Sequence, residues 1–269
     1  MFGRQKVTST RPRVARTTIS AIALLAAGAG AFFACSESTS PDQSGTFFGA
    51  STAMATGSGR AYVTLDRTGK PTELGVAITE AALIGLPATL TEYVFALPTE
   101  ASATAYKSAA INWQPTGHPP MNIFTVPHFD VHFYTITVGE RDAISPATDP
   151  QFASKMFRSP AAGFVPAGYT PDAMGFPRMG LHWADAAGPE FSGQPFVKTF
   201  IYGSYDGAFI FAEPMLTKAY LESKPATVVT PVKLPAQYAA SGYQPTSYTV
   251  SHDAAAKEYR IALTGLTQR

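Results

Sequence analysis

The residues best suited to chemistry lie in one short stretch at 127–134, which reads PHFDVHFY. It contains His128, Asp130 and His132, in a chain of 269 residues with only five histidines. Residues two apart on a β-strand share a face. If the stretch is a strand, these three side chains form one polar row, and the two phenylalanines and the valine between and after them form an apolar row behind it.

Two further residues complete a candidate metal site. His182 lies in a Met-Gly-Leu-His-Trp stretch, and Glu213 lies at the end of an expected strand. Imidazole and carboxylate ligands suit Zn, Mn, Fe or Cu. The predicted cofactor is therefore a transition metal (Zn, Mn, Fe or Cu), held by His128, Asp130, His132, His182 and Glu213. A catalytic site of this kind would use a carboxylate as fourth ligand or general base and keep a position open for water or substrate.

Strand geometry limits how these residues can share one ion. Positions four apart on a strand lie about 13 Å apart at the Cα, so His128 and His132 meet at one ion only at full stretch or across a bulge. Asp130 is about 6.6 Å from either neighbour, which is easier to bridge. The same row could instead be structural, hydrogen-bonding to itself and to nearby Tyr and Trp.

The residue pattern therefore allows two functions. The first is a metal-binding protein, and the sequence leaves open whether it is an enzyme. The second is a non-catalytic binding or assembly module of the cell envelope, in which the His/Asp cluster is structural. No Gly-x-Ser-x-Gly elbow, glycine-rich phosphate loop or Cys-x-x-Cys pair is present, which disfavours hydrolase, nucleotide and thiol chemistry of those types.

The two remaining histidines fit the candidate metal site less well. His118 stands between Gly117 and Pro119 in a proline-rich loop, which predicts a histidine at the rim of a site. His252 stands beside Asp253 in an expected turn, which predicts a solvent-exposed side chain.

The elements that must position these residues are mostly strands. Alternating patterns and turn residues predict hairpins from 60–66 with 74–79 and from 196–202 with 208–213, the latter ended by Pro214. Further strands are expected at 91–97 and 128–138, and two within 248–266. Short helices are expected at 101–110, 150–157 and 217–223, with a long irregular loop at 159–178. The predicted fold is mainly β, a β-sandwich or distorted β-barrel with two or three short helices.

The N-terminus predicts export and lipidation. Residues 1–18 carry five basic residues and no acid, and 19–34 form an apolar run too short to span a membrane. The run ends in Phe-Phe-Ala before Cys35, which resembles a bacterial lipobox, and Cys35 is the only cysteine. We therefore expect a lipoprotein signal peptide at 1–34, lipidation of Cys35, a flexible tether at 35–46 and a single β-rich domain at 47–269.

These features predict a place in the cell. The expected location is the cell envelope, with a lipid anchor in a membrane, or the secreted fraction. Ser36 after the cysteine favours the outer membrane over the inner one. Removal of the basic signal leaves a mildly acidic chain without a basic patch, which predicts that nucleic acid is not a partner.

Several short blocks resemble an uncharacterised bacterial family of secreted proteins and lipoproteins, known as a domain of unknown function. The blocks are GHPP at 117–120, PHFDxHFY at 127–134, MGxHW at 179–183 and EPMxT at 213–217, with a further similar block at 62–75. The resemblance covers most of residues 60–225. It implies a shared β-rich domain that forms a homo-oligomer, and it implies no established activity.

Overall fold

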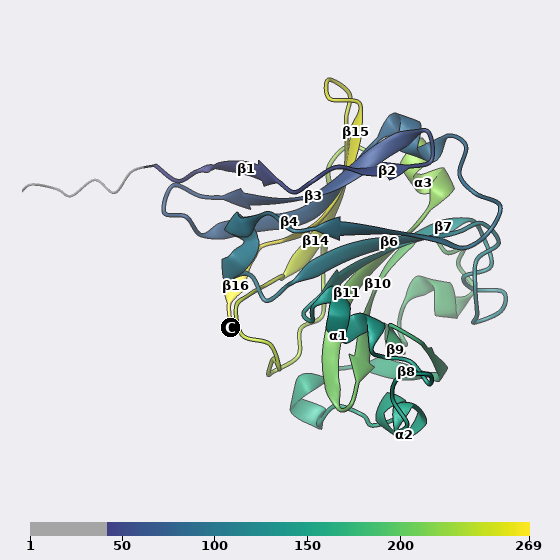
Figure 1. Ribbon diagram of the computed structural model, residues 1–269. Coiled ribbons are helices and arrows are strands. Elements are labelled where there is room, and N and C mark those ends of the chain that lie inside the picture. Colours follow the sequence, from purple (N-terminus) through teal and green to yellow (C-terminus); the bar gives the residue numbers. More distant parts are fainter. Residues whose placement is uncertain (1–41) are drawn as a thin grey trace, which may run out of the picture. The chain divides into compact units, whose positions relative to one another are not determined.

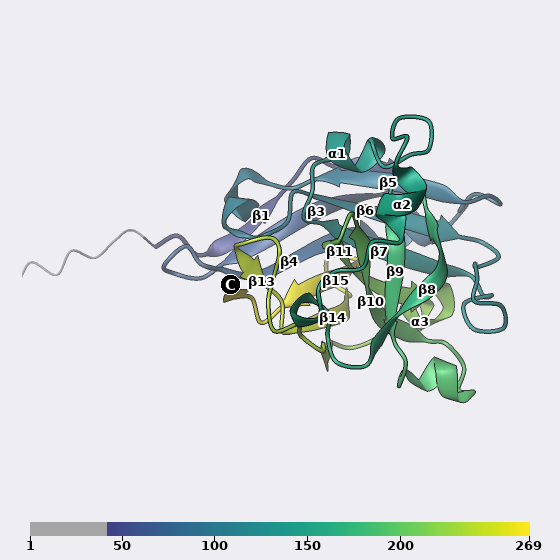
Figure 2. The same cartoon turned by 90° about the horizontal axis from the view of Figure 1, so that it is seen from below.

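Two seven-stranded antiparallel sheets dominate the computed structural model, which describes residues 42–269 (Figures 1 and 2). The first sheet runs in the order β1 (Gly45–Phe48), β3 (Gly57–Leu65), β4 (Pro71–Thr79), β15 (Glu258–Thr264), β14 (Ser247–Asp253) and β12 (Val228–Pro231), with β2 (Thr52–Met54) paired to β3. The second runs β5 (Thr91–Ala96), β6 (Ser108–Gln114), β7 (His128–Tyr134), β11 (Ala208–Thr217), β10 (Lys198–Tyr205), β9 (Gly180–Asp185) and β8 (Tyr169–Phe176). A small sheet pairs β13 (Tyr243–Gln244) with β16 (Thr267–Gln268).

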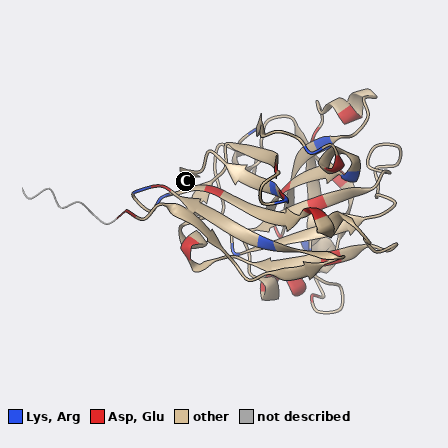
Figure 3. Ribbon diagram, turned by 90° about the horizontal axis from the view of Figure 1, so that it is seen from above, with Lys and Arg blue, Asp and Glu red and all other residues tan. Residues whose placement is uncertain are grey.

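Helices are few and short in the described part of the chain. They are α1 (Val138–Asp142), α2 (Phe152–Met156) and α3 (Lys218–Glu222), with 3₁₀ turns η1 (Glu80–Leu83), η2 (Thr99–Ala103), η3 (Ala162–Phe164) and η4 (Pro189–Ser192). Within residues 42–269, no helix has the length and apolar character to cross a membrane. Lys/Arg and Asp/Glu segments are interleaved over the strands and loops in the view of Figure 3.

The main hydrophobic core lies between the two large sheets. It includes Val63, Leu74 and Ile261 from the first sheet and Ile111 and Val131 from the second. Each fully buried side chain of this kind contributes about 1.5–3 kcal/mol through removal of apolar surface from water. Both sheets are open, so the fold is mainly β and sandwich-like, and the β-sandwich expected from the sequence is confirmed over the distorted barrel.

Several expected elements differ from the structure. Residues 108–110 belong to strand β6, although alanine-rich composition predicted a helix there, because pairing with both β5 and β7 overrides helix propensity. Strand β7 ends at Tyr134, and α1 begins four residues later with a Thr137 capping box. Strand β8 occupies the second half of the stretch expected to be an irregular loop.

Pro214 does not end strand β11, contrary to expectation. The strand continues to Thr217, and Phe200 on β10 stands opposite Pro214. On the other side, the ladder with β7 is interrupted between Ala212 and Met215. Proline has no N–H to donate, so the break falls where the backbone cannot pair.

The N-terminal predictions fall mainly on residues outside those described. The expected signal peptide at 1–34, Cys35 and most of the tether at 35–46 lie there. The last two residues of the expected tether, Gly45 and Thr46, are part of β1, where they pair with Leu65 and Thr64 of β3.

Candidate metal centre

Strand β7 carries the polar row that the alternating sequence predicted. All seven of its residues are buried, and it lies between β6 and β11 in the second sheet. Phe129, Val131 and Phe133 belong to the core between the sheets. His128, Asp130 and His132 alternate with them and therefore face the other side of the sheet. One strand thus supplies both the core and the candidate site.

Neighbouring strands bring two more of the predicted residues to this face. The β7–β11 register places Glu213 opposite His132, within the interrupted part of the ladder. His182 lies on β9, where it pairs with Gly203 of β10. A Cβ on Gly203 would lie 1.9 Å from the Phe211 ring, so only glycine allows this close approach.

The first cluster, which we call the His132 triad, consists of His132, His182 and Glu213. Nε2 of His132 lies 3.3 Å from Oε2 of Glu213, and Nε2 of His182 lies 3.8 Å from the same oxygen. The three residues are 0%, 7% and 1% exposed, respectively. These three ligand atoms have no hydrogen-bond partner among the described residues.

The second cluster, the His118 triad, consists of His118, His128 and Asp130. Nε2 of His128 lies 3.0 Å from Oδ1 of Asp130, and Nε2 of His118 lies 3.6 Å from Oδ2. In each triad the candidate ligand atoms all lie within 4.8 Å of one another.

The outer contacts of the His118 triad fix its ring orientations. Nδ1 of His128 lies 2.7 Å from the Val126 carbonyl, and Nδ1 of His118 lies 2.6 Å from the Pro119 carbonyl. Each Nδ1 can therefore donate its proton to the backbone and leave Nε2 free, which is the arrangement usual for metal-binding histidines. The Gln114 amide donates to Asp130 Oδ2 at 3.0 Å.

The spacings in both triads are near those that an ion requires. Bonds of about 2.0–2.1 Å in a tetrahedron place neighbouring ligand atoms about 3.4 Å apart. The imidazole–carboxylate separations of 3.0–3.8 Å scatter around this value. The other ligand-atom separations in each triad are at most 4.8 Å.

Burial and the neighbouring carboxylates act against each other in both triads. Burial opposes the charged form of His118, but Asp130 outweighs it and raises the pKa of His118 to about 9. Burial likewise disfavours the Asp130 carboxylate, yet His118 and His128 hold its pKa well below the usual range. Burial also opposes the charged form of His132, and the charge of Glu213 outweighs it and raises the pKa of His132. Burial lowers the pKa of His182.

A second carboxylate approaches His182 from β8. Oδ2 of Asp172 lies 3.9 Å from Nδ1 of His182, on the side of the ring away from Glu213. Burial raises the pKa of Asp172 to about 6, and Glu213 adds to the shift while His118 opposes it.

The five residues predicted from the sequence all lie at this face, but in two groups rather than one. His128 and Asp130 belong to one triad, and His132, His182 and Glu213 to the other. This division follows from the strand spacing that separates His128 from His132.

Three residues of this site were not among the metal ligands predicted from the sequence. His118 is a member of a triad, with a side chain only 23% exposed, because the loop turns back at Gly117 (φ +71°) and the His118 N–H bonds to the Phe124 carbonyl. Asp172 and Gln114 carried no spacing signal, since β8 and β6 were not expected as strands.

His252 lies in a position that differs from the expected one. Its side chain is 7% exposed, and Nε2 lies 2.7 Å from Oε1 of Glu80. The Glu80 contact comes from η1, which is far away in sequence, so the turn residues around His252 gave no sign of it.

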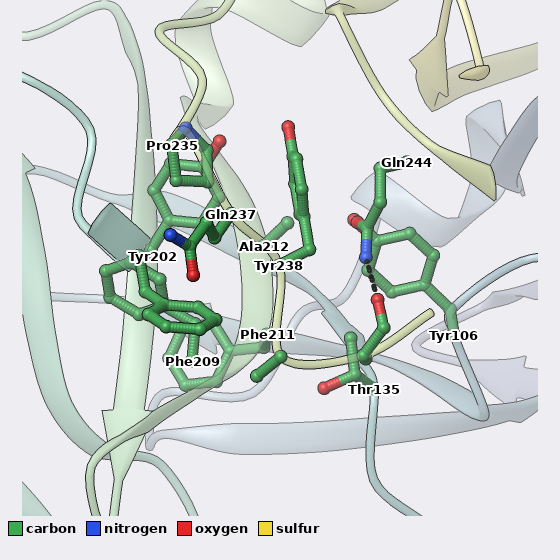
Figure 4. Close-up of a pocket in the computed structure, with 13 residues that line it drawn as sticks. Tyr106, Thr135, Tyr202, Phe209, Phe211, Ala212, Pro235, Gln237, Tyr238 and Gln244 are labelled. Atoms are coloured by element: carbon green, nitrogen blue, oxygen red, sulfur yellow. Dashed lines mark hydrogen bonds between the residues drawn. The ribbon is translucent and has the colours of Figure 1, made fainter. Parts of the chain in front are cut away.

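Both triads border one pocket of about 470 Å³ on the outer face of the second sheet. His118 and Asp130 line it from one triad and His182 from the other. A cavity of this volume is within the range of small-molecule sites. A separate cavity of about 30 Å³ lies among Tyr106, Tyr202 and Phe209 (Figure 4). The Tyr106 hydroxyl donates to Gln244 beside it. The cavity has room for only one or two water molecules.

Comparison with known proteins gives one partial match. The family model TTHB210-like, described as "Hypothetical protein TTHB210", matches residues 66–113, which run from the β3–β4 turn into β6. No curated protein and no solved structure matches the chain. The match agrees with similarity to an uncharacterised family, and it ends before all the triad residues.

Proposed function

We propose that this chain is a transition-metal-binding protein in which each triad holds one ion. The observation that carries the proposal is a set of buried ligand atoms that have no hydrogen-bond partner within residues 42–269. They are Nε2 of His128, His132 and His182, Oδ1 of Asp130 and Oε2 of Glu213. Buried polar atoms are nearly always paired, and an absent ion is a recognised reason for exceptions. All five face another candidate ligand atom within 4.8 Å.

The donor sets indicate the type of metal. Each triad offers two imidazoles and one carboxylate, and no thiolate. This set suits Zn in hydrolytic sites and Fe(II) in oxygen-using sites, and in both cases it leaves coordination positions for water or substrate. A bound ion would act as a Lewis acid and lower the pKa of a bound water.

A metal-free role has its own support and is the alternative. His128 and Asp130 at 3.0 Å, and His132 and Glu213 at 3.3 Å, can pair as ions without a metal. The cluster would then order the second sheet of a non-catalytic envelope binding or assembly module. Such a cluster would bind divalent ions weakly and without fixed stoichiometry.

Metal analysis of the purified protein separates the two functions. We expect about two equivalents of one transition metal after equilibration with Zn, Mn, Fe or Cu and removal of the free ion. A His132→Ala, His128→Ala double variant should retain almost none, whereas the His252→Ala variant, which lacks a histidine outside both triads, should retain both. Less than about 0.1 equivalent in the unaltered protein, with every one of these metals, would contradict the proposal.

We also propose that the chain is attached to the cell envelope through a lipid on Cys35. The support is the basic segment, the apolar run and the small residue before the single cysteine. Mass spectrometry of the N-terminal peptide should show a diacylglyceryl group on Cys35, and Cys35→Ser should move the protein from the membrane fraction to the soluble one. An unmodified Cys35 in membrane-associated protein would contradict the anchor.

A homo-oligomer is a further proposal. Edge strand β12 exposes Val228 and Val229, which are 37% and 60% exposed, and a free sheet edge can pair with another chain. Light scattering on the purified protein gives the molar mass directly. A monomer at working concentration would contradict the proposal.

A further inference from the structure

The pocket beside the triads has one wall that comes from a single hairpin tip. Residues 176–179, from the end of β8 to the start of β9, line it together with His182. Phe176 and Met179 make this wall apolar, and Leu90 before β5 adds to it. Leu90 is 58% exposed, so this side of the pocket opens to solvent.

The opposite wall is polar and belongs to the sheet. Asn112 and Gln114 on β6 line the pocket beside Asp130. Gln114 is already bonded to Asp130, whereas Asn112 is only 3% exposed and its Oδ1 has no hydrogen-bond partner among the described residues. An amide oxygen accepts hydrogen bonds, so the buried Oδ1 needs a donor, such as a water molecule held in the pocket.

The charges around the pocket cancel except at the triads. Arg178 at the hairpin tip pairs with Glu92 and with Asp142, and the buried Arg141 pairs with the same two acids. With the ions proposed above in place, two divalent charges face the carboxylates of Asp130 and Glu213. The floor of the pocket is then positive, even when the nearby Asp172 carboxylate is counted.

From this arrangement we infer that the pocket binds a small organic oxyanion, a carboxylate or phosphoryl group carried on an apolar body. This inference rests on the proposed metal binding. The oxyanion would bind at the positive floor between the triads. Oδ1 of Asn112 would accept a hydrogen bond from a water molecule that also donates to the oxyanion. The apolar body would lie against Phe176, Met179 and Leu90. The pocket of about 470 Å³ accepts a ligand the size of a substituted benzene ring.

Small ligands that share a benzene ring and differ in charge test the inference. The full protein is loaded with zinc, and its zinc content is measured before the ligands are added. Benzoate and phenyl phosphate carry the oxyanion, and benzamide has the same ring without the charge. Titration calorimetry should show saturable binding of at least one anion, at least tenfold tighter than benzamide. Anion binding should disappear when a chelator removes the zinc.

The Asn112→Leu variant tests the sheet wall. This variant should keep its zinc. Its affinity for the anion should fall about five- to tenfold, the typical effect of one lost hydrogen bond. Gln194→Leu, at an exposed site away from the pocket, should change neither. Zinc-loaded protein that binds neither anion, or that binds benzamide equally well, overturns the inference and leaves the metal proposal intact. Protein that takes up no zinc overturns the metal proposal instead.

Discussion

Replacing one carboxylate should remove one metal and leave the other. Glu213→Gln keeps the size of the side chain and deletes the charge that lies 3.3 Å from His132 and 3.8 Å from His182. The His118 triad takes no ligand from Glu213, because its carboxylate is Asp130. Asp130→Asn is therefore the matched variant, and the double variant should bind no metal tightly.

The expected size of the effect follows from linkage. An ion present at one hundred times its dissociation constant stabilises the folded state by about 2.7 kcal/mol. In a domain of roughly 150–250 residues, 1 kcal/mol shifts the melting temperature by about 2–4 °C. Each filled triad should therefore raise it by about 5–11 °C, and both together by about twice that amount.

Thermal unfolding with zinc and with a chelator provides the measurement. The zinc-dependent rise should be halved in each single variant and absent in the double variant, with each variant compared with its own chelated form. If Glu213→Gln alone removes the whole rise, the triads share one ion and the two-site reasoning fails. If it leaves the rise unchanged, Glu213 is not a ligand.

Three other outcomes follow from the same geometry. The pKa of His118 rises from 6.5 to about 9 on folding, so its pairing with Asp130 stabilises the metal-free protein fully below pH 6.5 and is lost as the pH rises through about 9. The melting temperature of the chelated protein should therefore fall as the pH rises from 6.5 to about 9. A melting temperature that does not change over this range, as expected for His118→Gln, would refute the pairing. Asp172→Asn should weaken metal binding at the His132 triad about 10–100-fold in an Asp130→Asn background, as loss of an outer ligand contact does, and equal affinity in dialysis would exclude that contact. Gly203→Ala should destabilise the fold by about 1–3 kcal/mol in urea unfolding, since the new Cβ meets the Phe211 ring, and a neutral change would show that the ring moves aside at no cost.

The polar row on β7 could be predicted from the sequence because it depends on local alternation alone. The hairpins around residues 66–71 and 206–207 were equally local, since glycine and aspartate at the turns mark them. The helices near 152–156 and 218–222 were also expected. What alternation cannot supply is the order of strands in the sheet.

The division into two triads depends on that order. Glu213 reaches His132 through the β7–β11 register, and His182 comes from β9, beyond β10. No spacing along the chain encodes these pairings. His118 is a similar case, because the return of its loop is fixed by contacts with Phe124 rather than by residue type. Local composition predicted a helix at Ala109 and Ala110, but pairing with β5 and β7 makes them part of a strand.

The alternation of β7 also restricts how this gene can change over time. A one-residue insertion or deletion within 128–134 would reverse every side chain beyond it, turning phenylalanines into the pocket and histidines into the core. A substitution in this strand changes one side chain, whereas no nearby substitution can reverse the effect of an insertion or deletion. The loop at 115–127 has no alternation of buried faces, so insertions and deletions in related sequences should occur mainly there. Because His118 lies in this loop, such changes should affect the His118 triad before the His132 triad.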